Sequence, residues 1–170
     1  MLTDLALPTA LHAPGHTLTL RRATEGDLPV IVAMLADDRI SAARKNDADG
    51  GDPEEYRSAM LEVLGNTSND LLVVVDASGN PVGTLQLTRV PSMARRGTTR
   101  LLVEAVRVHS NARSGGIGSA MMRWVTAEAA PAVGASLVQL TSDQARTDAH
   151  RFYERLGFAG SHRGFKFQLG

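Results

Sequence analysis

Residues 106–120 read VRVHSNARSGGIGSA, a strand-like segment followed by a short loop, a glycine-rich turn and the start of a helix. Successive backbone N–H groups at such a turn, backed by the positive end of a helix dipole, form a cradle for an anion. Glycine lets the backbone approach a ligand closely because it has no Cβ. Arg113 can add charge-assisted hydrogen bonds to phosphate. This stretch therefore predicts a site for a diphosphate group.

Two common phosphate-binding motifs do not fit this stretch. A P-loop needs a lysine followed by Ser or Thr after its second glycine, whereas Gly118 is followed by Ser119 and Ala120. The dinucleotide fingerprint needs a third glycine where Met121 stands. A glycine-rich turn can also be a simple tight connection. From these residues alone, two interpretations remain: the turn binds a diphosphate ligand, or it is only a tight connection between strand and helix.

A second motif, AHRFYERLGF at residues 149–158, follows about thirty residues later. Together with Arg113-x-x-Gly116-x-Gly118 it resembles the GNAT superfamily of N-acetyltransferases. The first element is similar to the family's pyrophosphate motif, (Gln/Arg)-x-x-Gly-x-(Gly/Ala). The second is similar to its C-terminal helix, Ala-x-x-x-Tyr-x-x-x-Gly-Phe. The resemblance covers the chain from about Leu18 to Leu169.

Hydrophobic periodicity and turn residues predict an alternation of strands and helices. Strands are expected at 17–22, 71–76, 82–90, 101–108, 136–140 and 164–169, and helices at 25–36, 54–64, 115 to about 131, and 147–156. The resemblance implies an α/β GNAT fold, with a mixed central β-sheet of six to seven strands, about four flanking helices, and a splay between the fourth and fifth strands. We expect residues 1–16 to be an N-terminal tail or leader segment and 17–170 a single N-acetyltransferase domain.

Composition excludes several classes of function. The chain has 170 residues, and its 18 Lys and Arg balance its 18 Asp and Glu, which argues against a generally basic nucleic-acid binder. Without cysteine it has no disulfide, thiolate zinc site or cysteine nucleophile. Apolar runs such as Leu71–Val75 are far below the ~20 residues of a membrane-spanning helix, and Met1–His16 is unlike a signal peptide. We expect a cytoplasmic protein with neither nucleic acid nor membrane as partner.

The neutral total conceals two charged segments. Residues 25–62 contain ten acids and four bases, a net charge of −6, whereas residues 89–113 contain six arginines and one acid, a net charge of +5. Such asymmetry can mark different partners, although two solvated faces would give the same pattern. The resemblance to the GNAT superfamily implies that the acidic region between Asp37 and Tyr56 lies where the acceptor is recruited, so we expect it to favour a cationic amine.

The resemblance implies acetyl-CoA, or CoA, as cosubstrate and no metal. The pantetheine arm is expected to pair with the backbone of Val106, Arg107 and Val108. The pyrophosphate is expected on the turn formed by Arg113, Ser114, Gly115, Gly116, Ile117, Gly118 and Ser119. Relatives often carry asparagine three residues before the motif's alanine; here Arg146 stands in that place and can reach phosphate. Ser142, at a strand end, is a polar substitute.

Two residues are candidates for catalysis. Tyr153 matches the family's tyrosine near the cofactor sulfur, where a phenol can protonate the leaving thiolate. Glu104 interrupts an apolar strand just before the cofactor segment; if partly desolvated there, its pKa would be raised, and it could take a proton from an ammonium through a water. The alternative is an exposed strand residue paired with Arg89 or Arg100.

The sequence therefore predicts a transferase, specifically an acyltransferase that moves an acetyl group from acetyl-CoA to the primary amine of a small molecule by direct attack in a ternary complex. A CoA-binding sensor or regulatory domain without turnover, and a peptide or protein N-acetyltransferase, are the alternatives. Because members of the family are often dimeric, we also expect a homodimer.

Overall fold

The computed structural model describes residues 1–37 and 52–169. Its chain divides into two compact units, Met1–Leu140 and Thr141–Gly170. Most of the acidic region expected to contact the acceptor, residues 38–51, lies outside the described residues. In the described part of the chain, no helix is both long and apolar enough to cross a membrane.

The first unit is built on a six-stranded sheet whose strands lie side by side in chain order. Four neighbouring pairs are antiparallel and the last pair is parallel, so the predicted mixed sheet is confirmed. The strands are β1 (Thr9–Ala13), β2 (His16–Arg22), β3 (Asn69–Val75), β4 (Pro81–Val90), β5 (Arg100–Val108) and β6 (Leu137–Leu140).

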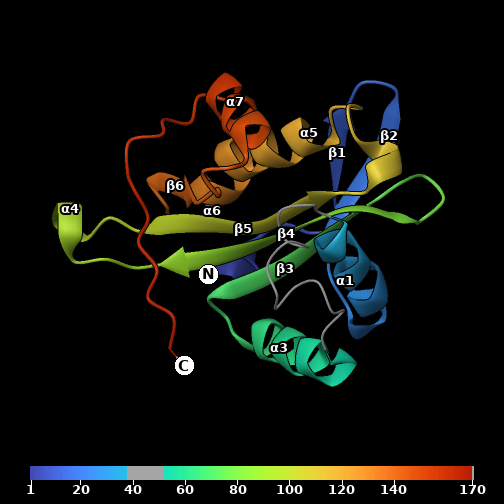
Figure 1. Ribbon diagram of the computed structural model, residues 1–170, viewed down its shortest axis with the longest axis horizontal. Coiled ribbons are helices and arrows are strands. Elements are labelled where there is room, and N and C mark those ends of the chain that lie inside the picture. Colours follow the sequence, from blue (N-terminus) through green and yellow to red (C-terminus); the bar gives the residue numbers. More distant parts are fainter. Residues whose placement is uncertain (38–51, 170) are drawn as a thin grey trace. The chain divides into compact units, whose positions relative to one another are not determined.

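Helices cover both faces of this sheet (Figure 1). On one face lie α1 (Leu28–Ala36) and α3 (Pro53–Gly65), and on the other α5 (Ile117–Trp124). Asp52 caps α3 by accepting a hydrogen bond from the Glu54 N–H at 3.0 Å, and Pro53 occupies the first turn, where no amide hydrogen is needed. The second unit contains α7 (Thr147–Arg155).

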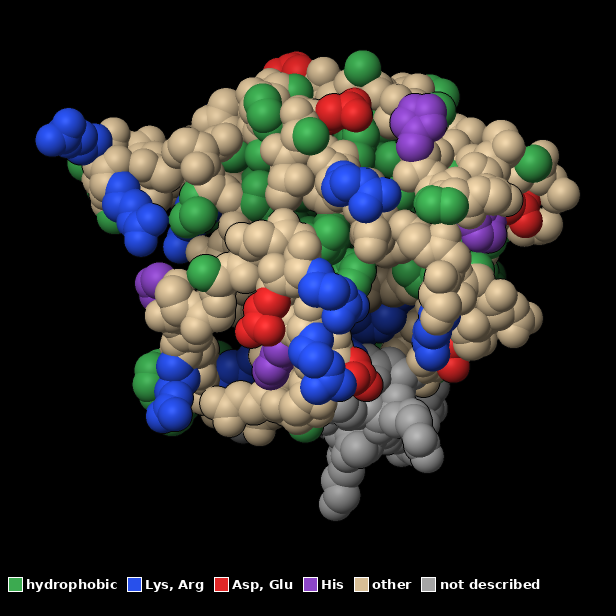
Figure 2. Space-filling view, turned by 90° about the horizontal axis from the view of Figure 1, so that it is seen from above, with side chains coloured by type: hydrophobic (Ala, Val, Ile, Leu, Met, Phe, Trp, Pro, Cys, Tyr) green, Lys and Arg blue, Asp and Glu red, His purple; other side chains and the backbone are tan. Residues whose placement is uncertain are grey.

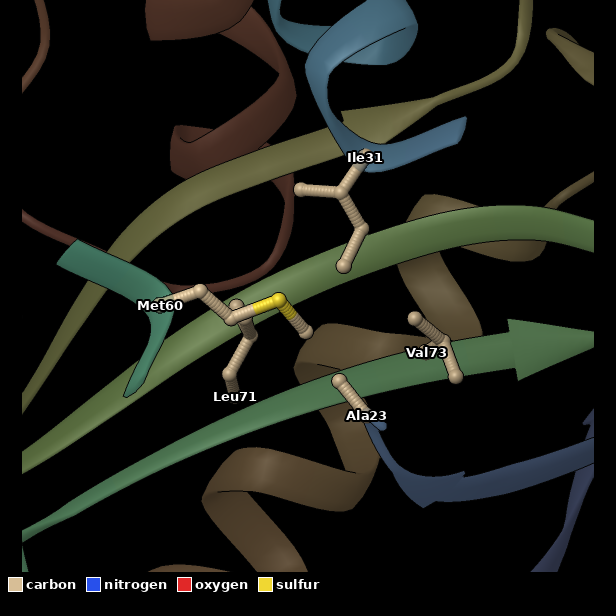
Figure 3. Close-up of a cluster of buried hydrophobic side chains, with 5 residues drawn as sticks. All are labelled: Ala23, Ile31, Met60, Leu71 and Val73. Atoms are coloured by element: carbon tan, nitrogen blue, oxygen red, sulfur yellow. The ribbon is translucent and has the colours of Figure 1, made fainter. Parts of the chain in front are cut away.

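Strand alternation divides the core between the two faces. Leu71 and Val73 of β3 pack with Ala23, Ile31 and Met60 on the face covered by α1 and α3 (Figure 3). The residue between them and the one after them point to the opposite face, because successive side chains of a strand alternate. β3 lies within the sheet because it pairs with β2 on one side and β4 on the other, and both of its faces are buried.

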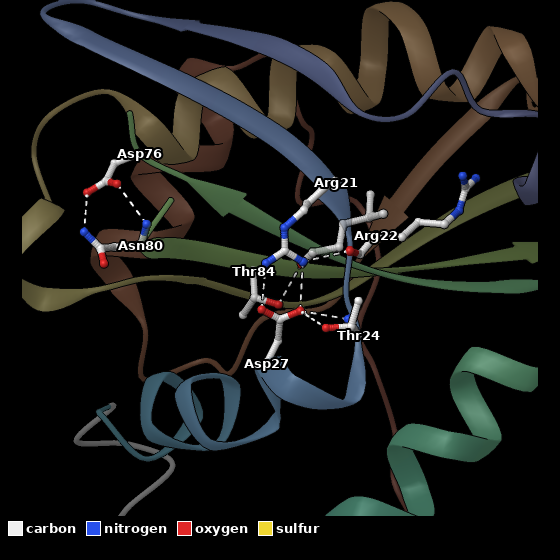
Figure 4. Close-up of polar contacts among 8 residues, drawn as sticks. Arg21, Arg22, Thr24, Asp27, Asp76, Asn80 and Thr84 are labelled. Carbon is white, nitrogen blue, oxygen red and sulfur yellow. Dashed lines mark hydrogen bonds and ion pairs between the residues drawn. The ribbon is translucent and has the colours of Figure 1, made fainter. Parts of the chain in front are cut away.

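A buried ion pair fixes the start of α1. Arg21 donates to both carboxylate oxygens of Asp27 at 2.8 Å, and Thr24 donates its N–H and hydroxyl to the same carboxylate (Figure 4). These contacts, with the Arg21 guanidinium as the largest cause, lower the pKa of Asp27 to about 2. The turn from β2 into the helix is therefore set by charge-assisted hydrogen bonds. A second carboxylate, Asp76, closes the β3–β4 turn with Asn80 (Figure 4).

The two ends of the chain differ from expectation. Residues 9–13, within the expected tail or leader, form β1 at the edge of the sheet, and Leu2 is buried. The helical run that starts at Ile117 passes through a π-helical turn, Val125–Ala129, and ends at α6 (Ala130–Ala132), close to the predicted end. The π turn itself was not predicted.

The predicted last strand, residues 164–169, is wrong. Its alternation of apolar and polar residues is typical of a strand, but a strand also requires a hydrogen-bonded neighbour. Within the described residues no neighbour pairs with it, and Phe165, Phe167 and Leu169 are 88–89% exposed. The predicted range of six to seven strands therefore resolves to six, because β1 replaces the missing strand.

Candidate active site

The sheet opens between its two parallel strands. β5 and β6 are paired from Arg100 with Leu137 to Val103 with Leu140, where β6 ends, while β5 continues to Val108. In the part of the chain that the structure describes, no strand pairs with β5 on this side beyond Val103. The opening corresponds to the predicted splay between the fourth and fifth strands, since β1 adds one strand to the count.

Backbone groups of β5 face this opening. The N–H of His109 donates to the Val82 carbonyl of the preceding strand at 2.9 Å. Because the C=O and N–H of one peptide point in opposite directions, the Val108 carbonyl points away from β4. It is reached from the other side by Arg113 Nε at 3.1 Å. At the end of the edge expected to pair with pantetheine, the Val108 carbonyl therefore points away from β4 and is bound by Arg113.

A β-bulge interrupts β5 just beyond the last residue paired with β6. Gln86 pairs with Glu104 and Thr84 with Arg107, so one residue of β4 opposes two of β5. Ala105 adopts the left-handed φ of 51°. In a regular strand two residues three positions apart face opposite sides. The bulge instead brings Glu104 and Arg107 to the same face.

This face is the one covered by α1 and α3. Gln86 pairs across the sheet with both Leu71 and Glu104, and directly opposed residues share a face. Glu104 is exposed, contrary to the partly desolvated setting that was expected. Gln86 also donates to the Asn69 side chain at 3.3 Å, which gives Glu104 a polar neighbourhood. Glu104 therefore stands with access to solvent on the α1 and α3 side of the sheet.

The two arginines considered as partners for Glu104 bind elsewhere. Arg89 Nε donates to the Val133 carbonyl at 3.1 Å, and Arg100 donates to the Gln139 side chain at 3.2 Å. The expected alternative, a strand carboxylate held by one of these cations, is therefore not what the structure shows.

The glycine-rich turn leads into α5 through two left-handed residues. Ser114 has a φ of 67°, and Gly116, the N-cap residue of the helix, has a φ of 80°. The first helical hydrogen bond runs from the Ala120 N–H to the Gly116 carbonyl at 2.9 Å. The preceding N–H groups of the first turn, those of residues 117–119, have no partner within the helix, which makes them the donors expected to face an anion. Ile117 is 1% exposed, so it offers only its backbone.

The glycines of this turn meet another part of the protein. A Cβ on Gly115 would lie 2.5 Å from His16 Nε2, and a Cβ on Gly116 would lie 3.3 Å from Pro14 Cδ. Both contacts come from the turn between β1 and β2. At these two positions glycine leaves room for that turn, and its close approach to a ligand stays a prediction.

Arg113 connects the end of β5 to the end of α1. Its Nη2 donates to the Asp37 carboxylate at 2.8 Å and to the Asp37 carbonyl at 2.9 Å. Asp37 was expected at the start of the acceptor region, and its contact with Arg113, 76 residues away in the chain, was not predicted. Binding of phosphate by Arg113 stays a prediction, and the structure adds that this guanidinium already has one carboxylate neighbour.

The second unit orients Tyr153 through the end of its helix. Gly157 adopts a φ of 89°, its N–H donates to Glu154, and the Phe158 N–H donates to the Tyr153 carbonyl at 3.1 Å. This is a Schellman cap, in which a contact between the same two side chains usually accompanies the hydrogen bonds. The Tyr153 and Phe158 rings indeed meet edge to face, with centroids 5.8 Å apart. The Leu-Gly-Phe sequence thus fixes the tyrosine.

Ser142 and Arg146 also belong to the second unit. The Ser142 Oγ is buried and has no hydrogen-bond partner among the described residues. Arg146 precedes α7, where its carbonyl accepts a hydrogen bond from the His150 N–H at 3.0 Å. Glu104, the backbone of 106–108 and the 113–119 turn are brought together in the first unit, whereas Tyr153, Ser142 and Arg146 share the second.

The profile described as the acetyltransferase (GNAT) family matches residues 34–158, well over half of the chain. The chain belongs to the GNAT family of acetyltransferases. It is therefore an acyltransferase by family, and the mixed sheet with helices on both faces is the GNAT fold. Among curated protein sequences, none shows significant similarity to this chain.

Solved structures show how this GNAT chain compares with others. A transcriptional regulator from Bacillus halodurans C-125 is 42% identical, with a TM-score of 0.81 over 89% of this chain and 99% of that one. Glucosamine-6-phosphate N-acetyltransferase from Arabidopsis thaliana has a TM-score of 0.70 at 15% identity, over 91% and 99% of the two chains. An aminoglycoside acetyltransferase from a soil metagenomic sample has a TM-score of 0.68 at 17% identity, over 90% and 99%. The latter two show likeness of fold.

The basic segment of this GNAT chain does not form one patch. Arg95 and Arg96 lie on α4 (Ala94–Gly97), the tip of the β4–β5 connection, which protrudes at the left of Figures 1 and 2. Arg113 lies beyond the other end of the nine-residue β5, a strand roughly 30 Å long. The segment 89–113, with its net charge of +5, therefore places only part of its charge beside the 113–119 turn.

Among the described residues, no group of three or more His, Asp or Glu side chains could hold a metal ion.

Proposed function

We propose that this GNAT acetyltransferase transfers the acetyl group of acetyl-CoA to the primary amine of a small molecule, by direct attack in a ternary complex. The observation that carries the proposal is the course of β5. This strand leaves β6 at Val103, bulges at Ala105 and leads into the 113–119 turn. It thus offers a backbone edge for an extended amide-containing chain and, at its end, N–H groups for a diphosphate.

The residues present fit this cosubstrate. The N–H groups at the start of α5 suit a diphosphate, and the buried Ser142 hydroxyl, without a partner among the described residues, suits a polar contact. When bound, acetyl-CoA would supply an activated acetyl thioester. Backbone N–H groups of β5 would stabilise the charge that develops on its carbonyl oxygen.

Glu104 is assigned as the general base. Its carboxylate stands on the face of the sheet that α1 and α3 cover. Since Glu104 is exposed, we assign it a water-relayed removal of the ammonium proton. The freed nitrogen lone pair forms the N–C bond while the C–S bond breaks.

Tyr153 is assigned as the group that returns a proton to the leaving sulfur. Phe158 and Phe152 contact its ring edge to face, with centroids 5.8 and 5.0 Å away, so the direction of the phenol is fixed by the helix end. A positioned phenol can act as a general acid on a thiolate. The ammonium gives up two protons in all: one passes through water to Glu104 and then to solvent, and the second leaves the nitrogen after the N–C bond forms and restores the Tyr153 phenol, so that one proton is released per acetyl transfer.

An amine panel with acetyl-CoA, read by thiol release, tests the proposal. The acidic residues that flank the α1 and α3 region favour a cationic acceptor by complementarity, so a polyamine-like amine should outcompete an anionic amine of similar size. A clear preference for the anion would remove the charge argument. A peptide panel run alongside would reveal a protein or peptide acceptor. The cytoplasmic location and the homodimer stay predictions of the sequence and the resemblance.

A second candidate is a CoA-binding regulatory domain without turnover. The observation that favours it is the 42% identity to a structure named a transcriptional regulator. The same backbone edge and turn would bind CoA in both cases, so binding alone does not separate the two. Saturable CoA binding with no turnover on any amine or peptide would support the regulator, whereas turnover that depends on Glu104 would support the enzyme.

A further inference from the structure

The turn between β1 and β2 packs directly against the predicted diphosphate cradle. His16 Nε2 lies 2.5 Å from where a Gly115 Cβ would stand, and His16 Cε1 lies 3.3 Å from the same point. Cβ atoms essentially never approach another heavy atom closer than 3.0 Å, so a side chain at position 115 would force the imidazole, the far end of the exposed His16 side chain, to move aside. The neighbouring Gly116 meets Pro14 Cδ and the Ala13 Cβ at 3.3 and 3.9 Å.

The β1–β2 turn is a tight connection closed by regular strand pairing. Ala13 and His16 pair as the last rung of the hairpin, and Gly15 turns the chain with a φ of 73°. Pro14 has a fixed φ, which removes one degree of freedom from the turn. The opposing segment needs such support, because Ser114 holds a left-handed φ of 67° that a residue with a Cβ seldom adopts.

We propose that His16 is a positioning residue of the cofactor site: with Pro14, it holds the Gly115–Gly116 turn in the conformation that presents the N–H groups of α5 to the cofactor diphosphate. This inference rests on the proposed function for its ligand. It adds that the cradle is built from two distant parts of the sequence, the N-terminal hairpin and the 113–119 turn. It also assigns the requirement for glycine at 115 to a protein contact instead of a ligand contact.

A double-mutant cycle between Gly115→Ala and His16→Ala tests the proposal. Gly115→Ala alone displaces the imidazole from the turn and should weaken CoA binding by about threefold, as measured by calorimetric titration. His16→Ala alone should also weaken binding, because the turn loses its support. In the double variant the imidazole is gone, so the added methyl group should cause little further loss. Matched controls are Gly65→Ala, where a Cβ meets no atom within 4 Å, and His12→Ala on β1.

The outcomes separate the two proposals. If Gly115→Ala weakens CoA binding as much in the His16→Ala background as in the wild type, the glycine serves the ligand and the positioning role is overturned. If Gly115→Ala does not fold and the double variant does, the steric contact is supported directly. If the wild type binds no CoA, the proposed function fails, and the turn's link to a cofactor fails with it. The same cycle in urea unfolding without ligand would still show whether His16 and Gly115 are coupled.

Discussion

Arg113 and Asp37 join the end of the cofactor strand to the end of the first helix. The Nη2 of Arg113 lies 2.8 Å from Asp37 Oδ2, while its Nε holds the Val108 carbonyl at 3.1 Å. One guanidinium thus bridges β5, which is expected to bind the cosubstrate, and α1, which leads into the region expected to bind the acceptor.

Replacing Arg113 with alanine should raise the KM for acetyl-CoA about tenfold and leave the free energy of unfolding within ~1 kcal/mol of wild type, since the pair is exposed. Asp37→Asn keeps the backbone carbonyl contact and is the matched control. If Arg113 also binds phosphate, Asp37→Asn should leave the KM unchanged or lower it, because the guanidinium loses its competing anion. A KM raised equally by both variants would assign Arg113 a purely structural role. Steady-state kinetics with acetyl-CoA varied give the answer.

Glu104→Gln should reduce kcat by a factor of about 10² to 10⁴, the usual contribution of a general base, and should remove the acid limb of the pH–rate profile. Stability should be unchanged, because Glu104 is exposed. Gln86→Glu, which places a second carboxylate directly across the sheet, is a useful companion. Retention of full kcat by Glu104→Gln, with an unaltered pH profile, would show that the base lies elsewhere.

Tyr153→Phe should lower kcat with little change in the KM for acetyl-CoA, since only the proton-donating hydroxyl is lost. Phe158→Ala keeps that hydroxyl but removes the ring that contacts Tyr153, so we expect a smaller loss of kcat. Gly157→Ala forces a Cβ into a φ of 89° and should destabilise the helix end by about 1 kcal/mol. An unchanged rate in Tyr153→Phe would end the role assigned to the phenol.

Acid stability should depend on Asp27. Its carboxylate is buried beside Arg21, and the pKa of about 2 corresponds to about 2 kcal/mol of stability at neutral pH. Because this pKa is lower in the folded than in the unfolded chain, the stabilisation is complete above pH ~4 and is lost as the pH falls toward 2. Urea unfolding measured across this range should show that slope in the wild type and not in Asp27→Asn.

Asp70 differs from Asp27 in the direction in which its pKa is shifted. Burial raises the pKa of Asp70 despite the Arg22 guanidinium 3.0 Å away. A raised carboxyl pKa acts in the opposite sense, so stability from this group falls as the pH rises through its folded pKa. Asp70→Asn should therefore flatten the unfolding free energy above pH ~4 and leave the acid slope of Asp27 intact.

Local patterns predicted most of the fold. The apolar run in residues 71–75 and the capping residues Asp52 and Pro53 act over a few residues, and the structure has β3 and α3 within two residues of their predicted limits. The stretch 106–120 likewise forms strand, turn and helix as predicted. The alternation in 164–169 failed because a strand also needs a neighbour, which periodicity does not supply.

The features that shape the site could not be predicted from residues that are neighbours in the sequence. Nothing in the residues around Ala105 indicates a left-handed alanine, yet this bulge decides that Glu104 and Arg107 share a face. The contact of His16 with Gly115 and the ion pair of Arg113 with Asp37 join segments 99 and 76 residues apart. Such contacts follow from the packing of the whole sheet.

The fit between the β1–β2 turn and the glycine turn bears on how this protein can be recombined with its relatives. The family match begins at residue 34, after both strands of the hairpin. A chimera joined there would combine the 13–16 turn of one parent with the 115–116 turn of another. Where the second parent carries a side chain at position 115, the His16 ring would have to move away from the glycine turn. Recombination should therefore exchange the two turns together, as one inherited unit.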